Sequence, residues 1–299
     1  MADRLRDVIA NARANKRCIT VPGCHDAMSA VLIQRAGFEI AFMSGFAVSA
    51  TQLAMPDAGL ISYAEMLTIG KNICDATHGK LLVIGDGDTG FGGPGNIRRT
   101  LRGYAAAGFA GISIEDQVYP KRCSYAKGLA VEPRPVALAR VRAAVEAIRE
   151  MRQEGLDLLL IARTDCRNAA EHGGLAEAIA RCSEFQALGA DMVYAEGLGS
   201  LDEMEALAKA VRVPTMLAQV ERPGQALISA QEAAAAGFTL NLLGLTVLNV
   251  AMFAMKSALG ELATGRHPAS ETRMPFAELY AETGFDEHYR WEDRFQSKM

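Results

Sequence analysis

Eight short apolar runs recur along the chain, with longer segments of helical character between them. Continuous apolar runs are typical of parallel strands that are buried on both faces. The eight runs are Cys18–Pro22, Ile40–Ser44, Leu81–Asp86, Gly111–Glu115, Leu158–Arg163, Met192–Glu196, Thr215–Gln219 and Leu240–Leu243. Eight strand–helix repeats within 299 residues predict a TIM-type (β/α)8 barrel of the α/β class. The competing fold is a doubly wound sheet, which usually has fewer strands.

The segments between the runs carry helix signals. Arg140–Glu154 and Leu175–Leu188 show helical spacing, and Ile97–Ala107 follows Asn96, a candidate N-cap. Helices are expected to end at a C′ glycine before the next strand; these glycines are Gly37, Gly108, Gly189 and Gly237. Because no linker or low-complexity stretch interrupts the pattern, we expect one barrel domain over residues 1–299, with a C-terminal helical extension from about Pro268.

Composition excludes several classes of protein. Half of the residues are hydrophobic and the net charge is −4, which leaves no basic footprint for nucleic acid. Six scattered cysteines without a Cys-x-x-Cys pair indicate reduced thiols, as in a cytoplasmic protein. The first residues carry charges early and lack the apolar core of a signal peptide.

One uncharged stretch, 233–255, is long enough to span a bilayer. Gly244 divides it into a strand-like half, Phe238–Leu243, and a helix-like half, Leu245–Ala258. We therefore expect a buried strand, turn and helix here, and no membrane segment.

Polar residues close six of the predicted strands: Ser44, Asp86 with Asp88, Glu115, Arg163 with Asp165, Glu196 and Gln219. A single strand end can be polar merely because it meets water, but active sites of barrels lie at this end of the strands. Carboxylates gathered at neighbouring strand ends repel one another unless a cation relieves the repulsion, and Mg²⁺ suits hard oxygen ligands. The pattern predicts a metal-assisted enzyme if the strands are neighbours.

The glycine-rich segment Gly85-x-Gly87-x-x-Gly90 formally matches a dinucleotide-binding fingerprint. Asp86 and Asp88 would repel a pyrophosphate, and the required helix does not begin there because further glycines and a proline follow. We expect the glycines to let a loop approach a ligand instead.

The segment that follows the Glu115 strand places Cys123 among the basic residues Lys121, Arg122 and Lys127. A thiol in such a loop can act as a general acid or base, and the alternative is an incidental thiol on a surface loop. An arginine such as Arg163 at a strand end can clamp a carboxylate, or form an internal ion pair, for example with Glu196.

Taken together, these residues resemble the isocitrate lyase / phosphoenolpyruvate mutase superfamily over about residues 21–255. The motifs that carry the resemblance are Ser44-Gly45, Asp86-Gly87-Asp88-Thr89-Gly90-Phe91-Gly92, Glu115-Asp116-Gln117, Pro120-Lys121-Arg122-Cys123, Ile161-Ala162-Arg163-Thr164-Asp165 and Ala195-Glu196-Gly197. Lys-Arg-Cys is similar to the catalytic loop of the branch with 2-methylisocitrate lyase and 2,3-dimethylmalate lyase. The mutase branch has an Asn and no cysteine there.

The resemblance implies a Mg²⁺-dependent enzyme, with Mn²⁺ as a substitute, that acts on a small carboxylic acid. The implied metal residues are Asp86, Asp88 and Glu115, which hold the ion directly or through water, with Asp57 in support. Cys123, Arg163 and Glu115 are the implied catalytic residues, Cys123 protonating the departing carbanion of a retro-aldol cleavage. The implied substrate-binding residues are Ser44, Gly45, Phe46, Arg163, Glu196, Gln219 and Thr246. Members of the superfamily are often homotetramers that exchange a C-terminal helix, which residues from about Pro275 onward could provide.

The chain also departs from the pattern of the lyase branch. Its catalytic loop usually continues Cys-Gly-His, whereas this chain has Ser124 and Tyr125 after the cysteine. Gln219-Val220-Glu221 stands where methylisocitrate lyases have Asn-x-Thr, and Asn249 replaces a usual Arg although Thr246 keeps its register. The loss of these carboxylate partners argues against a tricarboxylate substrate.

We therefore expect a carbon–carbon lyase that cleaves a small 2-hydroxy diacid, or a related acid, through an enolate. Oxaloacetate decarboxylation or hydrolysis is the alternative within the superfamily, together with carboxyphosphonoenolpyruvate-type mutase chemistry, against which the retained Cys123 argues. A non-catalytic barrel that binds a metabolite is the alternative of another class.

Overall fold

The computed structural model describes residues 1–222 and 227–295. Eight parallel strands pair in chain order, and β1 pairs with β8 to close a barrel. The strands are β1 (Ile19–Cys24), β2 (Ile40–Met43), β3 (Leu82–Asp86), β4 (Gly111–Glu115), β5 (Leu159–Thr164), β6 (Met192–Ala195), β7 (Thr215–Ala218) and β8 (Leu240–Leu243). All eight predicted strands are confirmed, most within one residue at each end, and the (β/α)8 fold is confirmed with them.

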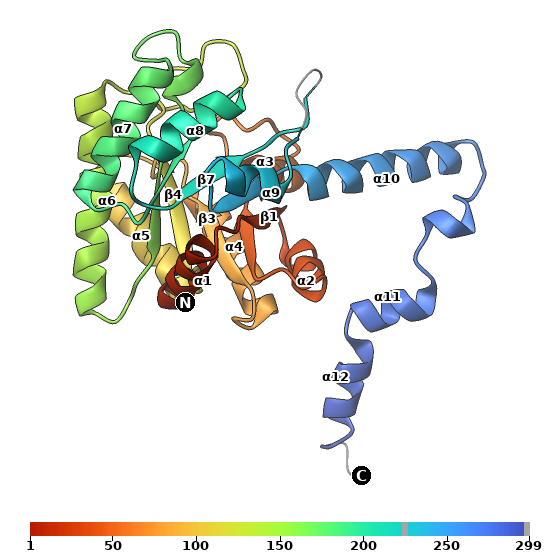
Figure 1. Ribbon diagram of the computed structural model, residues 1–299. Coiled ribbons are helices and arrows are strands. Elements are labelled where there is room, and N and C mark those ends of the chain that lie inside the picture. The colour runs from red at the N-terminus through yellow and green to blue at the C-terminus, as the bar shows by residue number, and fades with distance from the viewer. Residues whose placement is uncertain (223–226, 296–299) are drawn as a thin grey trace. The chain divides into compact units, whose positions relative to one another are not determined.

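Helices surround the barrel (Figure 1). They are α1 (Ala2–Ala14), α2 (Ala27–Arg35), α3 (Gly45–Leu53), α4 (Tyr63–Thr77), α5 (Pro94–Ala107), α6 (Arg134–Gln153), α7 (Leu175–Leu188), α8 (Leu201–Ala210) and α9 (Ala230–Ala235), with a 3-10 turn at Cys166–Asn168. Helix α10 (Thr246–Ala263) follows β8 in the chain. All four predicted glycines have a positive φ at the end of a helix, which L side chains rarely adopt.

Two helices begin earlier than the sequence pattern predicts. Helix α5 starts at Pro94 with Gly93 as its N-cap, so the expected cap at Asn96 is wrong. Helix α6 starts at Arg134 and carries a proline in its first turn. Proline fixes a helical φ and lacks only an N–H that the first turn leaves unbonded, so it opens both helices without cost.

Two layers of apolar side chains form the core of the barrel unit. The inner layer fills the barrel and includes Phe42, Ile84 and Tyr194, together with Leu5 and Ile9 from α1. The outer layer lies between the strands and the surrounding helices. Helix α1 therefore closes the N-terminal end of the barrel and leaves the C-terminal strand ends for a site.

The closing seam of the barrel requires glycine. Gly23 on β1 lies so close to Gly244, just after β8, that a Cβ at Gly23 would stand 2.1 Å from the Gly244 carbonyl oxygen. Gly244 also separates β8 from α10, as the sequence predicted for the uncharged stretch. Among the described helices, none has the length and apolar character needed to cross a membrane.

The chain divides into two compact units, residues 1–248 and 249–299. The first holds all eight strands. The second holds most of α10, a 3-10 turn at Ser270–Thr272, α11 (Phe276–Glu282) and α12 (Phe285–Glu292). Its described part exposes large apolar side chains, among them Val250, Phe253, Leu259, Phe276 and Trp291.

Candidate active site

Three adjacent strands bring the two acidic clusters together. Strand β4 pairs with β3 on one side and with β5 on the other, and Glu115 lies opposite Arg163 in the register. The Glu115 amide also donates to the Asp88 carbonyl at 2.9 Å, which joins the two strand ends directly. The predicted neighbours are therefore neighbours, at the end of the barrel where active sites of this fold lie.

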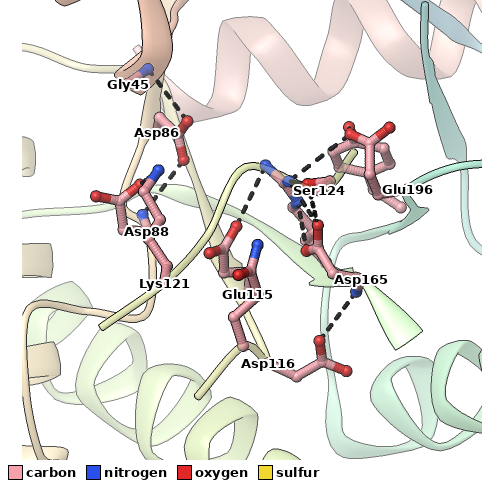
Figure 2. A network of polar contacts seen from close by, with 12 residues as sticks. Gly45, Asp86, Asp88, Glu115, Asp116, Lys121, Ser124, Asp165 and Glu196 are labelled. Carbon is pink, nitrogen blue, oxygen red and sulfur yellow. Dashed lines mark hydrogen bonds and ion pairs between the residues drawn. The ribbon is translucent and has the colours of Figure 1, made fainter. Parts of the chain in front are cut away.

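Lys121 lies among the carboxylates that the sequence suggested for a metal (Figure 2). Its Nζ is 2.7 Å from Asp57 Oδ1 and 2.5 Å from Asp88 Oδ1. Asp86 accepts the backbone N–H groups of Gly45 and Asp88, at 3.2 and 3.3 Å. Asp57 thus lies next to the site, where the sequence reading put it.

Negative charge exceeds positive charge in this cluster. Burial, together with Asp86 and Asp57, raises the pKa of Asp88 to about 7, although Lys121 opposes the rise. Burial also raises the pKa of Glu115 well above its usual value, against the effect of Arg163. Burial acts against the charge of Lys121, but the surrounding carboxylates hold its pKa well above the usual value.

The donor set fits a hydrated divalent cation. Both Glu115 carboxylate oxygens are buried and have no hydrogen-bond partner within the described part of the chain. Across residues 1–222 and 227–295, no three His, Cys, Asp or Glu side chains are grouped closely enough to hold an ion by themselves. Mg²⁺ usually keeps several waters and takes only one or two protein carboxylates, so the negative charge and the oxygen donors of Asp86, Asp88 and Glu115 suit it.

Arg163 is held by side chains from three strand ends. Its Nε and Nη2 donate to the two oxygens of Asp165 at 2.8 Å each, and Nη1 lies 3.3 Å from Glu115 Oε2. Glu196 Oε2 is 3.7 Å away, so the internal ion pair that the sequence suggested is present. The bidentate contact with Asp165 fixes the plane of the guanidinium.

Cys123 lies in the segment 117–131 after β4, which we call the Cys123 loop. Its thiol is partly exposed. The next two residues reach across the site, because Ser124 Oγ contacts Asp165 and Arg163 while the Tyr125 hydroxyl donates to Glu196. Sequence reasoning identified these two positions as departures but did not predict their partners.

The loop after β2 supplies a helix N-terminus. Ser44 is the N-cap of α3, and its Oγ accepts the Ala47 amide at 3.3 Å. Gly45 faces the acidic cluster, because a Cβ there would stand 3.0 Å from Asp86 Oδ2. Phe46 follows in the first turn of α3. Gly45 thus lies beside the acidic cluster, and the substrate-binding roles of Ser44, Gly45 and Phe46 stay predictions.

Two further predicted positions lie after β7 and β8. The Gln219 amide nitrogen donates to Ile228 O and Asn241 Oδ1, at 2.9 and 2.7 Å, and its oxygen accepts the Ile228 amide at 2.8 Å. In this structure Gln219 therefore holds Ile228 close to the end of β7. Thr246 is the first residue of α10.

A buried arginine on α7 supports the site through Asp116. Arg181 on α7 is completely buried and pairs with Asp116 at 2.9 Å and Glu177 at 2.8 Å. Asp116 in turn accepts the Thr164 hydroxyl and the Asp165 amide. Sequence reasoning missed Arg181, although it lies on the apolar stripe of α7 where a charge requires a partner.

Two glycines of the fingerprint-like segment, Gly85 and Gly87, pack closely against neighbouring residues, and the expected approach of the loop to a ligand stays a prediction. A Cβ at Gly85 would stand 2.5 Å from the Tyr104 ring, and one at Gly87 would stand 2.7 Å from the Ser113 carbonyl oxygen. The Tyr104 hydroxyl also donates to the Asp86 carbonyl at 2.8 Å. The tyrosine that packs against Gly85 therefore also fixes the backbone of Asp86.

Comparisons with known proteins agree with this geometry. The family profile described as Phosphoenolpyruvate phosphomutase matches residues 9–263. A probable 2-methylisocitrate lyase of Corynebacterium glutamicum is 36% identical over 86% of this chain and 80% of its own length. The chloroplastic carboxyvinyl-carboxyphosphonate phosphorylmutase of Arabidopsis thaliana is 35% identical over 82% of this chain and 70% of its own.

Solved structures give the same result. Oxaloacetate acetylhydrolase in complex with 3,3-difluorooxalacetate superposes with a TM-score of 0.90 and 30% identity, over 99% of this chain and 97% of its own. Phosphonopyruvate hydrolase in complex with oxalate and Mg²⁺ superposes with a TM-score of 0.82 and 25% identity, over 98% and 99%. The chain belongs to the phosphoenolpyruvate phosphomutase family, within the isocitrate lyase / phosphoenolpyruvate mutase superfamily of lyases and related enzymes.

Proposed function

We propose that this enzyme is a Mg²⁺-dependent lyase that cleaves a carbon–carbon bond in a small 2-hydroxy diacid, or a related acid, through an enolate. The observation that carries the proposal is the convergence of Asp86, Asp88, Glu115 and Arg163 at adjacent strand ends, beneath the loop that holds Cys123. Within the described part of the chain, Lys121 and the largely buried Arg163 are the cations that pair with these carboxylates, which suits a small acid better than a tricarboxylate.

The residues around Arg163 fit the substrate side of such a reaction. Its Nη1 faces Glu115 without a well-formed hydrogen bond, which leaves that nitrogen able to donate to a substrate oxygen. In the cleavage, the 2-hydroxyl gives its proton to water and becomes a carbonyl while the adjacent carbon–carbon bond breaks. The electron pair of that bond passes to the departing fragment as an enolate. The Cys123 thiol protonates the carbon of that enolate, and the resulting thiolate takes a proton back from water.

Asp86, Asp88 and Glu115 would hold Mg²⁺, with Asp57 orienting the group through Lys121. When bound, the ion supplies positive charge next to the oxygen on which negative charge develops. Burial of the carboxylates keeps bulk water from screening that charge.

The test is a screen of 2-hydroxy and 2-keto di- and tricarboxylates with Mg²⁺, read out by keto-acid release. Once a substrate is found, Cys123→Ser should lower kcat about a hundredfold or more while KM changes little. Cys18→Ser is the matched control, because this partly buried thiol lies before β1 at the opposite end of the strands. Full turnover by Cys123→Ser would remove the thiol from the proposed mechanism.

Hydrolysis of oxaloacetate is the second candidate, and the similarity to oxaloacetate acetylhydrolase over nearly the whole chain favours it. With oxaloacetate as substrate, hydrolysis yields oxalate and acetate, whereas decarboxylation releases CO₂. Measuring all three products separates the two reactions from each other and from the retro-aldol lyase, which leaves oxaloacetate unchanged.

A further inference from the structure

Two hydroxyl groups on the Cys123 loop connect the loop to the ends of β5 and β6. The base of the loop is held mainly through its backbone, since Gln117 and Val131 form an antiparallel bridge, the Val118 amide donates to the Ala130 carbonyl at 3.0 Å, and Arg140 Nη1 donates to the Gln117 carbonyl at 2.8 Å. Nearer the tip lie residues 121–125. Lys121, Ser124 and Tyr125 contact the site through their side chains, and Cys123 lies between them. The position of the tip, and of Cys123 within it, therefore depends on side-chain contacts.

Ser124 connects the tip to β5. Its Oγ donates to Asp165 Oδ1 at 2.5 Å and accepts from Arg163 Nη2 at 2.8 Å. The hydroxyl thus completes a closed ring with the bidentate Arg163–Asp165 pair (Figure 2). A residue without a side-chain hydroxyl could not fill this place.

Tyr125 connects the tip to β6. Its hydroxyl donates to Glu196, which also accepts the Tyr194 hydroxyl and, at 3.0 Å, the Gly197 amide. The guanidinium of Arg222, which follows β7, lies 3.9 Å from the centre of the Tyr125 ring. The charged and titratable groups that face Tyr125 are therefore Glu196, Tyr194, Arg163 and Arg222.

Cys123 lies between the two kinds of anchor. Lys121, two residues before it, is held by Asp57 and Asp88, and Ser124 and Tyr125 follow it directly. With contacts on both sides within two residues, the backbone of Cys123 has little freedom to move. A general acid has to lie within hydrogen-bond reach of the atom that it protonates.

We propose that Ser124 and Tyr125 are positioning residues that hold the Cys123 loop over the site, Ser124 through Asp165 and Arg163 and Tyr125 through Glu196. This inference rests on the proposed function. Neither hydroxyl changes its charge near neutral pH, so the hydroxyls of Ser124 and Tyr125 add no titration of their own to loop closure between about pH 6 and 8. A histidine at position 125 would titrate in that range and make closure depend on pH.

The experiment compares amide hydrogen exchange of the peptides that cover residues 119–130 in the intact protein and in Tyr125→Phe. Loss of one hydrogen bond to a buried carboxylate should raise exchange in this loop about tenfold, with peptides from β3 and β4 unchanged. Tyr119→Phe is the matched control in the same loop, since this tyrosine is 60% exposed and reaches Gly59 O only at 3.5 Å. Ser124→Ala should act as Tyr125→Phe does, and Ser124→Thr, which keeps the hydroxyl, should restore protection.

Turnover gives a second readout once a substrate is known. Tyr125→Phe should lower kcat about tenfold with a smaller change in KM, because the thiol is misplaced while substrate contacts remain. In Tyr125→His, kcat should depend on pH with a midpoint near 6.5, which a purely structural role would not produce. Loop exchange equal to that of Tyr119→Phe in both Tyr125→Phe and Ser124→Ala would overturn the inference. The exchange experiment needs no turnover, so it separates failure of this inference from failure of the proposed function.

Discussion

Lys121 places one ammonium group against Asp57 and Asp88, with Asp86 and Glu115 close enough to raise its pKa. One ammonium group cannot balance the four carboxylates around it, and burial, together with the charges of Asp86 and Asp57, raises the pKa of Asp88 to about 7. The charge imbalance at this point is the physical reason to expect a divalent ion.

Asp88→Asn should weaken Mg²⁺ binding at least about tenfold, since it removes a negative charge and a hard oxygen ligand. Isothermal calorimetry with Mg²⁺ alone measures the change without any substrate. Asp75→Asn is the matched control, because Asp75 is an exposed carboxylate that also pairs with a lysine, Lys71. Equal affinities in all three proteins would place the ion elsewhere or remove it.

Arg181→Met should lower the free energy of unfolding by about 3–5 kcal/mol, because it leaves the buried Asp116 carboxylate without its cation. Urea unfolding measures the loss. The double variant with Asp116→Asn should recover much of it, whereas simple additivity of the two changes would contradict a direct coupling.

Which site residues the sequence reveals depends on how far their partners lie along the chain. Asp86, Asp88, Glu115 and Arg163 follow strands that pair in chain order, so the fold alone brings them together. Ser124 contacts Asp165, 41 positions away, and Tyr125 contacts Glu196, 71 positions away. Both contacts are made by side chains of a loop, and the pattern of strands and helices does not predict where a loop places its side chains.

At the scale of elements, strands were easier to predict than helix starts. Each strand is a continuous apolar run buried on both faces, and so its bounds can be read directly. Helices α5 and α6 begin in segments rich in glycine, proline and charge, where the apolar spacing has not yet begun. Their first turns are set by proline and by packing, not by periodicity.

Helix α1 is fixed to the barrel by Arg6, which donates to Asp157 at 2.6 Å and to Asp191 at 3.0 Å. Burial opposes the charge of Asp157, but hydrogen bonds from Arg6 and Arg152 hold the pKa of that carboxyl below its usual value. This part of the stability is present above the unfolded pKa of about 3.9 and is lost as the pH falls through the lower folded value.

Asp157→Asn should therefore destabilise the protein by about 1 kcal/mol at pH 7, since the pair is partly exposed. The difference between variant and parent should shrink as the pH falls below about 4. Urea unfolding at several pH values checks this, with Asp3→Asn as a control because Asp3 pairs with the same arginine but is 91% exposed. A difference that stays constant down to pH 3 would contradict the assignment.

At the scale of the molecule, residues 249–295 expose many large apolar side chains, and exposed apolar patches mark sites of association. We propose that a second copy of the chain covers this surface and that the enzyme is a homo-oligomer, a tetramer by resemblance. Sedimentation velocity should show an assembly, and Phe253→Asp should shift it toward smaller species; Phe253 is 74% exposed. Lys256→Asp, a neighbouring exposed polar position, is the control, and a parent protein that sediments as a monomer would contradict the proposal.

Trp291, the single tryptophan of the chain, belongs to the second unit and is 58% exposed. Intrinsic tryptophan fluorescence therefore reports on residues 249–299 and not on the barrel. Unfolding of the variants described above is better followed by far-ultraviolet circular dichroism, which the strands and helices of the barrel dominate. The emission wavelength of Trp291 can instead report on the proposed assembly. A second copy of the chain that covers Trp291 should shift its emission to shorter wavelength.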